Sequence, residues 1–594
     1  MPRYNPNNAE QLRKLRDAMS ASSKALRPVR EEVERMTKVY AGSHYMGTGR
    51  ERQPVNLFQL AMRIYRRQII GGTPQALVTT NYAGAATQCY EFQIALNYLL
   101  RMMNFRAAMA ESFTQAMFRM GICKIGITQP EEARLYGMDH ISGQPYCEPI
   151  LLDDWIHDTT ARREEQQDFR ANRYRVPLEE AKENSLYDKR FRERLRPSGQ
   201  SEMSADNFGE GGASQTLGHD NNMLGDVEFR EHVDLWDVWL PRDQLLVTVA
   251  ADDPESKPAR VVEWEGPRNG PFELLSLDVL PGNVVPVSMA SSLIDMNELI
   301  NSMYRKLADQ AKRQKSLAFA SGMATASGKA QAIIDAADGE ALNCDDPNAV
   351  KEVHLGGIDQ PSLAFAMHLK DIFSYIAGNM DSLGGLSQQG KTLGQEELIA
   401  ASSGTLVGEL QGIMNQYTER CQRSVGYYLW TDRTMTWKLT KPIGEIGGVP
   451  INVDFDWTPE RRTADYYGMV IEINPYSMRE QGPQQRLQGL MQAAQMLLPM
   501  LPMMQQDGLK WDWQEFVREI SKLGDIDSLA SILKTAAEPM AIDPMAQQGG
   551  DMHGPATTTR NYVRRNVAGG PTPQNQTAQM VTAMMGSNDQ GRAA

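Results

Sequence analysis

The spacing of apolar residues predicts a chain made mostly of helices. Apolar side chains recur every three or four positions over residues 9–38 and 55–70, which is the period of a helix buried along one side. Residues 88–120 form a longer apolar stretch, which we interpret as one helix that ends at Gly121. Alternating apolar and polar positions over residues 123–128 then predict a short strand.

The next part of the chain departs from this helical pattern. Residues 160–196 are densely charged with both signs, which is typical of a solvated helix or of a helix that faces another subunit. Residues 197–222 are rich in Gly, Ser, Asn and Asp, so we expect a loop or a disordered insert there. Further strands are expected at residues 227–239, 245–250 and 259–264, followed by a turn at 267–271.

Residues 288–315 carry the clearest periodic signal in the chain. Their apolar positions follow one another at intervals of four and three residues in strict alternation. This heptad-like stripe is the pattern of a helix packed lengthwise on another helix. The stripe consists of Met289, Leu293, Met296, Ile300, Met303 and Leu307.

After this helix comes a segment of small residues, 318–358, and then a second predicted helix at 359–380. A Gly/Gln/Ser loop at 382–394 leads into a very long helix at 395–430. Its internal glycines each weaken the helix by about 1 kcal/mol relative to alanine, so bending there is plausible. These glycines are Gly404, Gly408 and Gly412; beyond them we expect strands at 434–439 and 451–457, helices at 478–504 and 513–535, and a mobile tail from 539.

The C-terminal half of the 288–315 helix is basic. Its positions 305 and 312, and likewise 306 and 313, are seven residues apart and so lie near one edge of the helix. Two interpretations stay open. The strip faces phosphate or a partner protein, or its cations simply complement the negative end of the helix dipole. The basic residues are Arg305, Lys306, Lys312, Arg313 and Lys315, set against the single acid Asp309.

Residues 385–392, GLSQQGKT, match the phosphate-binding loop G-x-x-x-x-G-K-[ST]. In a nucleotidase, Lys391 would reach the β- and γ-phosphates and Thr392 would bind Mg²⁺. That motif must follow a buried strand, yet the preceding residues have helical spacing, and the best Mg²⁺-binding acid, Asp153, lies far upstream. We therefore favour a flexible loop between two helices over an ATP site.

Residues 153–158, DDWIHD, combine carboxylates with a histidine. Such a cluster can bind a metal, but in a short stretch after a strand it more often caps turns. The five cysteines, Cys89, Cys123, Cys147, Cys344 and Cys421, form no CxxC pair, so neither a disulfide framework nor a thiolate zinc site is expected. Buried packing is the better interpretation of Cys123 and Cys147.

Composition adds limits to these patterns. The chain has 594 residues, 41% of them hydrophobic and 23% charged, which is ordinary for a globular protein. A net charge of −13 argues against a protein that grips nucleic acid over its whole surface. We expect neither a signal peptide nor a spanning helix, because no stretch approaches about 18 uninterrupted apolar residues.

The order of these elements resembles that of the portal proteins of tailed bacteriophages, and especially of short-tailed phages. These proteins are head-to-tail connectors of mixed α+β, helix-rich fold that assemble into a ring. The resemblance covers roughly residues 50–530 and rests on element order and loose motifs. The motifs are PVNL at 54–57, GTP at 72–74, GPFEL at 270–274, LPGNVVP at 280–286, LIDMN at 293–297 and RKLADQAKRQK at 305–315.

The resemblance implies a division of the chain into the parts of such a subunit. Two stem helices would flank a small clip, which docks the packaging motor and later the tail adaptor, and a tunnel loop would carry Gln388, Gln389 and Lys391 into the channel. The implied parts are an N-terminal arm and wing (1–287), a stem helix (288–317), the clip (318–358), a stem helix (359–381), the tunnel loop (382–396), a long bent helix and wing return (397–477), crown helices (478–538) and a flexible tail (539–594).

A portal protein would be a ring of roughly twelve copies at one capsid vertex, with no catalysis and no cofactor. Viral double-stranded DNA would be packaged and ejected through it. Twelve helices about 10 Å wide enclose a bore about 28 Å across, wider than a duplex of about 20 Å. The expected partners are further copies, DNA that is contacted weakly, the terminase large subunit, a tail adaptor, and capsid and scaffolding proteins. No membrane is expected; the protein would be made in the host cytoplasm and reside in the virion.

Two other classes of function compete with this one. A nucleotide-driven motor would use Lys391 and Thr392, and a strand before Gly385 would favour it, whereas a helix there favours the portal. A scaffolding or tail-tube protein is the third class, but scaffolds tend to be simple helical rods, unlike this mixture of strands, helices and a long loop.

Overall fold

The computed structural model describes a chain of mixed α+β fold, in agreement with the expected fold class. All described residues belong to one compact unit, Met1–Pro499. Among them, no helix is long and apolar enough to cross a membrane. The described residues are 8–42, 55–128, 143–197, 230–251, 257–313, 315–320, 350–355, 358–383, 393–446, 449–474, 477–478, 491–492 and 494–495.

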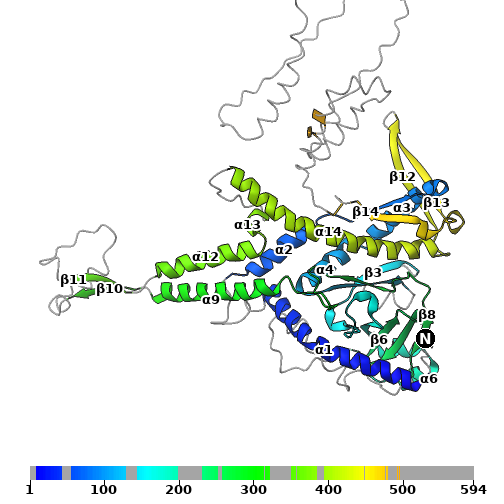
Figure 1. The fold of residues 1–594 in the computed structure, drawn as a ribbon, viewed down its shortest axis with the longest axis horizontal. Helices are drawn as coiled ribbons and strands as arrows, with labels where there is room; N and C mark the ends of the chain where they lie inside the picture. The colour runs from blue at the N-terminus through cyan, green and yellow to red at the C-terminus, as the bar shows by residue number, and fades with distance from the viewer. Residues whose placement is uncertain are drawn as a thin grey trace, which may run out of the picture. The chain divides into compact units, whose positions relative to one another are not determined.

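A five-stranded antiparallel sheet forms one part of this unit, with the strand order β4-β5-β6-β7-β8. Helix α1 (Ala9–Ala41) lies across one face (Figure 1) and buries Leu12, Leu15 and Met19 against the sheet. Helices α5 (Leu178–Glu183) and α6 (Lys189–Arg194) pack in a separate apolar cluster. The strands are β4 (Trp155–His157), β5 (Arg170–Pro177), β6 (His232–Leu240), β7 (Leu245–Ala250) and β8 (Arg260–Glu263).

Strand β5 corrects part of the expectation of a charged helix over residues 160–196, in which only α5 and α6 are α-helical. Arg170 and Arg173 are buried in it and lie directly opposite Trp239 and Trp236 of β6. Their guanidinium groups stack over these indole rings, with centroid distances of 5.7 and 5.8 Å. Dense charge therefore marked a buried strand here, because each cation meets an aromatic ring of β6 and an acid in a short turn beside the sheet, Glu164 for Arg170 and Asp154 for Arg173.

The second sheet of this unit has three antiparallel strands in the order β3-β2-β9. It consists of β2 (Gly121–Ile127), β3 (Pro145–Pro149) and β9 (Phe272–Leu275). Helices α4 (Phe105–Phe118) and α14 (Leu393–Thr431) both contact it. The main hydrophobic core runs from this sheet through α2 (Leu57–Ile69) and α3 (Ala86–Met102).

The single helix expected over residues 88–120 is two helices. Helix α3 ends at Met102 and α4 begins at Phe105. Between them Asn104 adopts a left-handed conformation with φ of 49°, which asparagine tolerates better than most residues. The break lets both helices bury apolar faces, which a straight helix of the same length would separate.

Two helices that pack along each other project from the core and carry a hairpin at their far end (Figure 1). The chain runs outward along α9 (Ser291–Arg313), turns through the antiparallel strands β10 (Lys315–Ala320) and β11 (Val350–Leu355), and returns along α12 (Gln360–Ile376). The short helix α13 (Met380–Leu383) follows, and α14 then crosses the core. We call α9 and α12 the helical pair.

Two further antiparallel pairs complete the described fold. Strand β1 (Ala76–Thr80) pairs with β14 (Met469–Ile473), and neither was expected from the sequence. Strands β12 (Trp437–Ile446) and β13 (Val449–Trp457) form a longer hairpin than predicted. Its base packs on α3, where Phe92 stacks on Trp457 at 5.8 Å between ring centroids.

Most of the remaining predicted elements are confirmed with shifted ends, among them the helices at 9–38, 55–70 and 359–380, the long helix at 395–430, and the turn at 267–271. The insert at 197–222 and the loop at 382–394 fall almost wholly outside the described residues. The helix at 513–535 and the tail from 539 fall wholly outside them, and of the helix at 478–504 only residues 478, 491–492 and 494–495 are described.

Glycines in two places should respond oppositely to alanine. A Cβ at Gly121 would overlap the backbone oxygen of Ser112, whereas a Cβ at Gly408 would meet nothing within 4 Å. We expect Gly121→Ala to lower the free energy of unfolding by about 2 kcal/mol through overpacking. Gly408→Ala should raise it by up to about 1 kcal/mol. Denaturant midpoints of the two variants check this, and equal shifts of the same sign would contradict the packing.

Candidate functional site

The helical pair is held together by the predicted heptad stripe. Leu293, Ile300 and Leu307 are buried on α9, and the methionines Met296 and Met303 are half-buried. Helix α12 buries a corresponding line of Ala366, Leu369 and Phe373. The prediction that helix 288–315 packs lengthwise on another helix is therefore confirmed.

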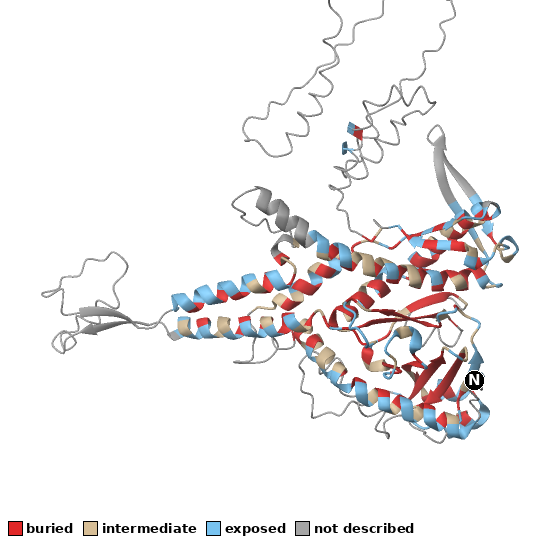
Figure 2. Cartoon of the chain, in the orientation of Figure 1, coloured by how far each residue is buried: buried red, intermediate tan, exposed pale blue. Residues whose placement is uncertain are grey.

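Helix α12 is unusual because exposed apolar side chains lie on both of its flanks, one of which also carries the exposed Lys370. Successive residues of a helix are about 100° apart, so Phe365 and Ile376 project to one side of the buried line. Leu363 and Met367 project to the opposite side. All four are exposed, by 46, 44, 43 and 54% respectively, and exposed positions run along both helices in Figure 2. We call these the Phe365 flank and the Met367 flank.

The fourth side of α12, opposite α9, is mainly polar. Gln360, His368, Asp371 and Tyr375 fall on it at helical spacing, and all four are exposed. We call this line the polar ridge. Its formal charge is close to neutral, in contrast with the basic end of α9.

The five residues of the predicted basic strip do not all lie on one exposed side of α9. Lys306 and Lys312 are exposed on α9, and Arg305 is half-buried. Arg313 is the last residue of α9. Lys315 does not belong to the helix at all, because it begins β10, and this corrects the expected helix end.

The exposed side of α9 changes its charge along its length. Nearer the core it carries Asp295 and Glu298, which bind Arg35 of α1 at 3.5 and 2.8 Å. The basic residues follow farther out. By helical spacing, Arg305 and Lys312 fall on the side of α9 away from the buried stripe that contains Ile300.

The phosphate-loop motif at 385–392, with Gln388, Gln389 and Lys391, lies outside the described residues. The element that precedes it is described, and it is the helix α13, which itself follows α12. A phosphate-binding loop requires a buried strand at this point. The structural context thus departs from that of a nucleotidase.

The DDWIHD stretch is used for structural hydrogen bonds. Asp154 pairs with Arg173 at 3.0 Å, and Asp158 accepts hydrogen bonds from the backbone nitrogen and hydroxyl of Thr160 at 3.0 and 2.6 Å. Arg30 of α1 donates to the carbonyl oxygens of Leu152 and Trp155. Around residues 153–158 the described residues form no group of three or more potential metal ligands, so the turn-capping interpretation fits this stretch.

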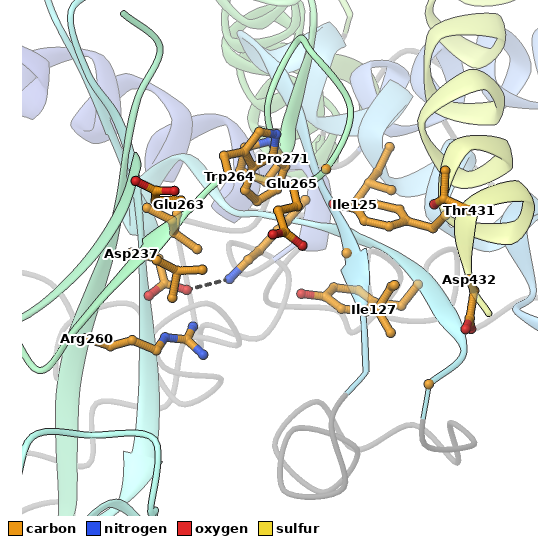
Figure 3. Close-up of a pocket in the computed structure, with 18 of the residues that line it drawn as sticks. Ile125, Ile127, Asp237, Arg260, Glu263, Trp264, Glu265, Pro271, Thr431 and Asp432 are labelled. Atoms are coloured by element: carbon orange, nitrogen blue, oxygen red, sulfur yellow. Dashed lines mark hydrogen bonds and ion pairs between the residues drawn. The ribbon is translucent and has the colours of Figure 1, made fainter. Parts of the chain in front are cut away.

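Buried ion pairs join the sheets, and sequence inspection did not find them. Lys124 of β2 binds Asp237 of β6 at 2.9 Å, with both side chains buried. Thr248 also donates to Asp237, at 2.7 Å. Asp237 points toward a cleft of about 1150 Å³ that Arg260 and Trp264 help to line (Figure 3).

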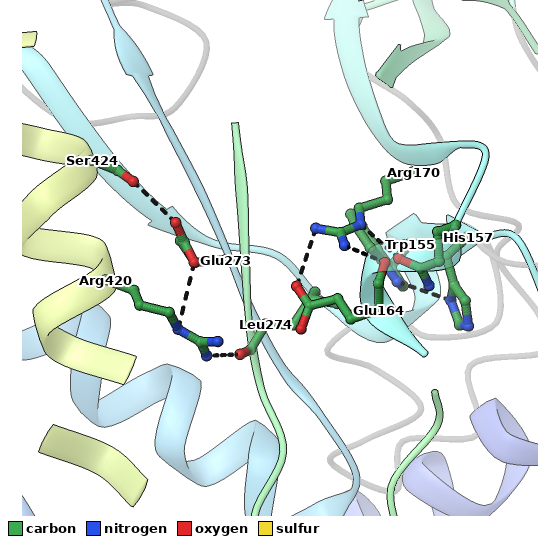
Figure 4. Close-up of polar contacts among 9 residues, drawn as sticks. Trp155, His157, Glu164, Arg170, Glu273, Leu274, Arg420 and Ser424 are labelled. Atoms are coloured by element: carbon green, nitrogen blue, oxygen red, sulfur yellow. Dashed lines mark hydrogen bonds and ion pairs between the residues drawn. The ribbon is translucent and has the colours of Figure 1, made fainter. Parts of the chain in front are cut away.

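A second polar network connects α14 with β9 (Figure 4). Ser424 donates to Glu273 at 3.0 Å, and Arg420 donates to the carbonyl oxygen of Leu274 at 2.6 Å. On the far side of β9, Arg170 pairs with Glu164 at 3.2 Å. Removing one member would leave a buried charge without its partner, which is costly.

The chain matches no family model and no curated protein.

His157 should make stability depend on pH. Burial and the nearby Arg170 lower its pKa from 6.5 to about 4; Arg30 adds to this and Asp158 opposes it. The unfolded chain therefore takes up this proton at a higher pH than the folded chain. The contribution of His157 to the free energy of unfolding is therefore complete above pH 6.5. This contribution, up to about 3 kcal/mol, is lost as the pH falls toward 4.

The difference between wild type and His157→Gln isolates this contribution. Trp155 donates to Nδ1 of His157 at 3.2 Å, a bond that the glutamine oxygen can accept. The wild type should lose more stability than the variant between pH 6.5 and 4 in denaturant titrations. Parallel pH profiles of the two proteins would contradict the assignment.

Proposed function

We propose that this chain is the subunit of a viral portal ring, through which double-stranded DNA enters and leaves a capsid. The support comes first from the order of the elements. A helix leads out, two paired strands follow, a second helix returns, and a very long helix comes after it. This order is compatible with the stem, clip, stem and long helix that the resemblance implies, and the proposed tunnel loop lies almost wholly outside the described residues.

The observation that carries the proposal is the pair of apolar flanks on α12. Apolar surface on two opposite sides of one helix needs two neighbours. A two-fold dimer uses one self-complementary patch and would leave one flank bare. Copies arranged head to tail cover both flanks, since the Phe365 flank of one copy then contacts the Met367 flank of the next. Such heterologous contacts form a ring when the rotation from one copy to the next closes.

In this ring the polar ridge of α12 lines the channel. Helix α12 and the short α13 precede the proposed tunnel loop, and the ridge of α12 lies opposite its contact with α9. Little charge on the ridge keeps phosphate contacts weak, and each avoided contact lowers the friction on moving DNA. Lys391, Gln388 and Gln389 of the tunnel loop would touch the duplex transiently.

The basic strip then has a different role from the ridge. Arg305, Lys306 and Lys312 lie on the outer side of the ring, where the partners are proteins. The terminase large subunit, the tail adaptor, and the capsid and scaffolding proteins would dock around this end and the hairpin. The assembly would occupy one vertex of the virion at the head–tail junction, and the chain itself would perform no catalysis.

Substitutions on the two flanks test the head-to-tail contact. Phe365→Asp should weaken self-association more than tenfold, because it places a charge in an apolar contact, and Met367→Asp should do the same. Tyr375→Ser on the polar ridge is the matched control and should assemble like wild type. Sedimentation velocity measures all three.

Mixing the two flank variants separates a head-to-tail contact from a two-fold one. The intact Met367 flank of the Phe365→Asp chain can still bind the intact Phe365 flank of the Met367→Asp chain. The mixture should therefore form a dimer of one copy of each and stop there. A mixture that stays monomeric, or variants that each dimerise alone, would contradict the proposed ring contact.

Lys391 distinguishes the portal from a motor. In a portal ring, Lys391→Ala should leave assembly unchanged, and the wild type should show no ATP hydrolysis that depends on this residue. The measurement is phosphate release by both proteins at matched oligomeric state. ATP hydrolysis that disappears in Lys391→Ala would overturn the portal and favour the motor.

A further inference from the structure

Three cysteines that lie far apart in the sequence meet at one point in the core. Cys123 is on β2, Cys147 on the neighbouring strand β3, and Cys421 on α14, which packs on both strands. Their side chains are buried, with exposures of 0, 3 and 0%. Each thiol is within hydrogen-bonding reach of the other two. We call this group the thiol cluster.

Polar contacts prepare one of these sulfurs for reaction. The sulfur of Cys123 is 3.0 Å from the hydroxyl oxygen of Ser112. Burial opposes ionisation of Cys123, but hydrogen bonds from Cys147, Cys421 and Ser112 outweigh it and hold the pKa of this thiol below its ordinary value. The pKa of Cys147 and that of Cys421 are raised. A thiol whose pKa is lowered, beside two thiols whose pKa is raised, is the arrangement in which a sulfenic acid is resolved into a disulfide.

The geometry points to a modification site: peroxide oxidises the thiol cluster to a disulfide between Cys421 and Cys123, which ties α14 covalently to the sheet. This step does not depend on the proposed function. Peroxide is small enough to reach the cluster when the core opens locally. The packing role expected for these cysteines describes only the reduced form.

The chemistry balances in two steps. The Cys123 thiolate attacks one peroxide oxygen, so that an S–O bond forms, the O–O bond breaks, and hydroxide leaves and is protonated to water. The Cys421 sulfur then attacks the sulfenic sulfur, so that the S–S bond forms and a second water leaves. Two thiols are oxidised and one peroxide is reduced to two waters.

Strand register selects Cys421 over Cys147 as the partner. Cys147 lies opposite Ile125 and is therefore displaced by two residues from Cys123. Such diagonal pairs have Cα atoms about 7–8 Å apart, beyond the usual disulfide range of about 4.4–6.8 Å. Cys421 approaches the sheet from the helix above it and is free of this constraint.

The experiment treats the folded full-length chain with hydrogen peroxide, blocks remaining thiols, and maps its peptides by mass spectrometry without reduction. Most of the Cys421 peptide should be found joined to the Cys123 peptide, two hydrogens lighter than the sum. Cys89 on α3 is the matched control, because it is equally buried but lies outside the cluster. It should remain a free thiol.

Two variants separate the outcomes. Cys147→Ser retains the reacting pair and should still form the cross-link. Cys421→Ser removes the resolving thiol, so dimedone should trap a sulfenic acid at Cys123. A thermal midpoint that rises by several degrees on oxidation, and returns with dithiothreitol, should accompany the cross-link in wild type. Cross-linking to Cys147 instead, equal oxidation of Cys89, or no cross-link before unfolding would overturn the proposal.

Discussion

The contact between α9 and α12 is the constraint from which the functional account follows. The two helices leave the core together, and the apolar line along α9 needs a partner along its whole length. Once α12 supplies that partner, its remaining sides are fixed by the helical period. The same register that buries Leu369 and Phe373 turns Phe365 and Met367 outward on opposite flanks. The apolar stripe of α9 is thus covered within the helical pair, while α12 still exposes apolar side chains on two opposite sides.

The core from which the pair projects is joined by buried charges as well as by apolar packing. Lys124 and Asp237 connect the two sheets, and Arg420 and Glu273 connect α14 with β9. Such pairs add little net stability compared with apolar residues, but losing one partner is expensive. They therefore favour one relative placement of sheet and helix. That rigidity suits the proposed ring subunit, in which the helical pair and the long helix would keep fixed angles.

The sequence predicted the features that depend on local periodicity. The heptad stripe located α9 and its lengthwise packing, and helical spacing located α12 and α14. Features that depend on distant partners were missed. Strand β5 was read as a solvated helix because its arginines are neutralised by residues that come from β6 and from the 153–154 turn. The break at Asn104 rests on one residue in a left-handed conformation, and apolar spacing continues across it.

The thiol cluster and the flanks of α12 illustrate the same limit. No spacing rule brings Cys123, Cys147 and Cys421 together, because only the packing of α14 on the sheet does so. The flanks could not be predicted because a helix with apolar residues on three sides looks like a core helix in the sequence. Only the structure shows that α9 covers one of these sides and leaves the other two exposed.

Electron microscopy of the purified assembly tests the central claim most directly. The account predicts a closed ring of identical copies with an axial bore about 28 Å across for roughly twelve helices, lined by the polar ridge of α12, with Lys306 and Lys312 on the outer surface. An assembly without an axial hole, or a ring whose bore is lined by the basic side of α9, would contradict it.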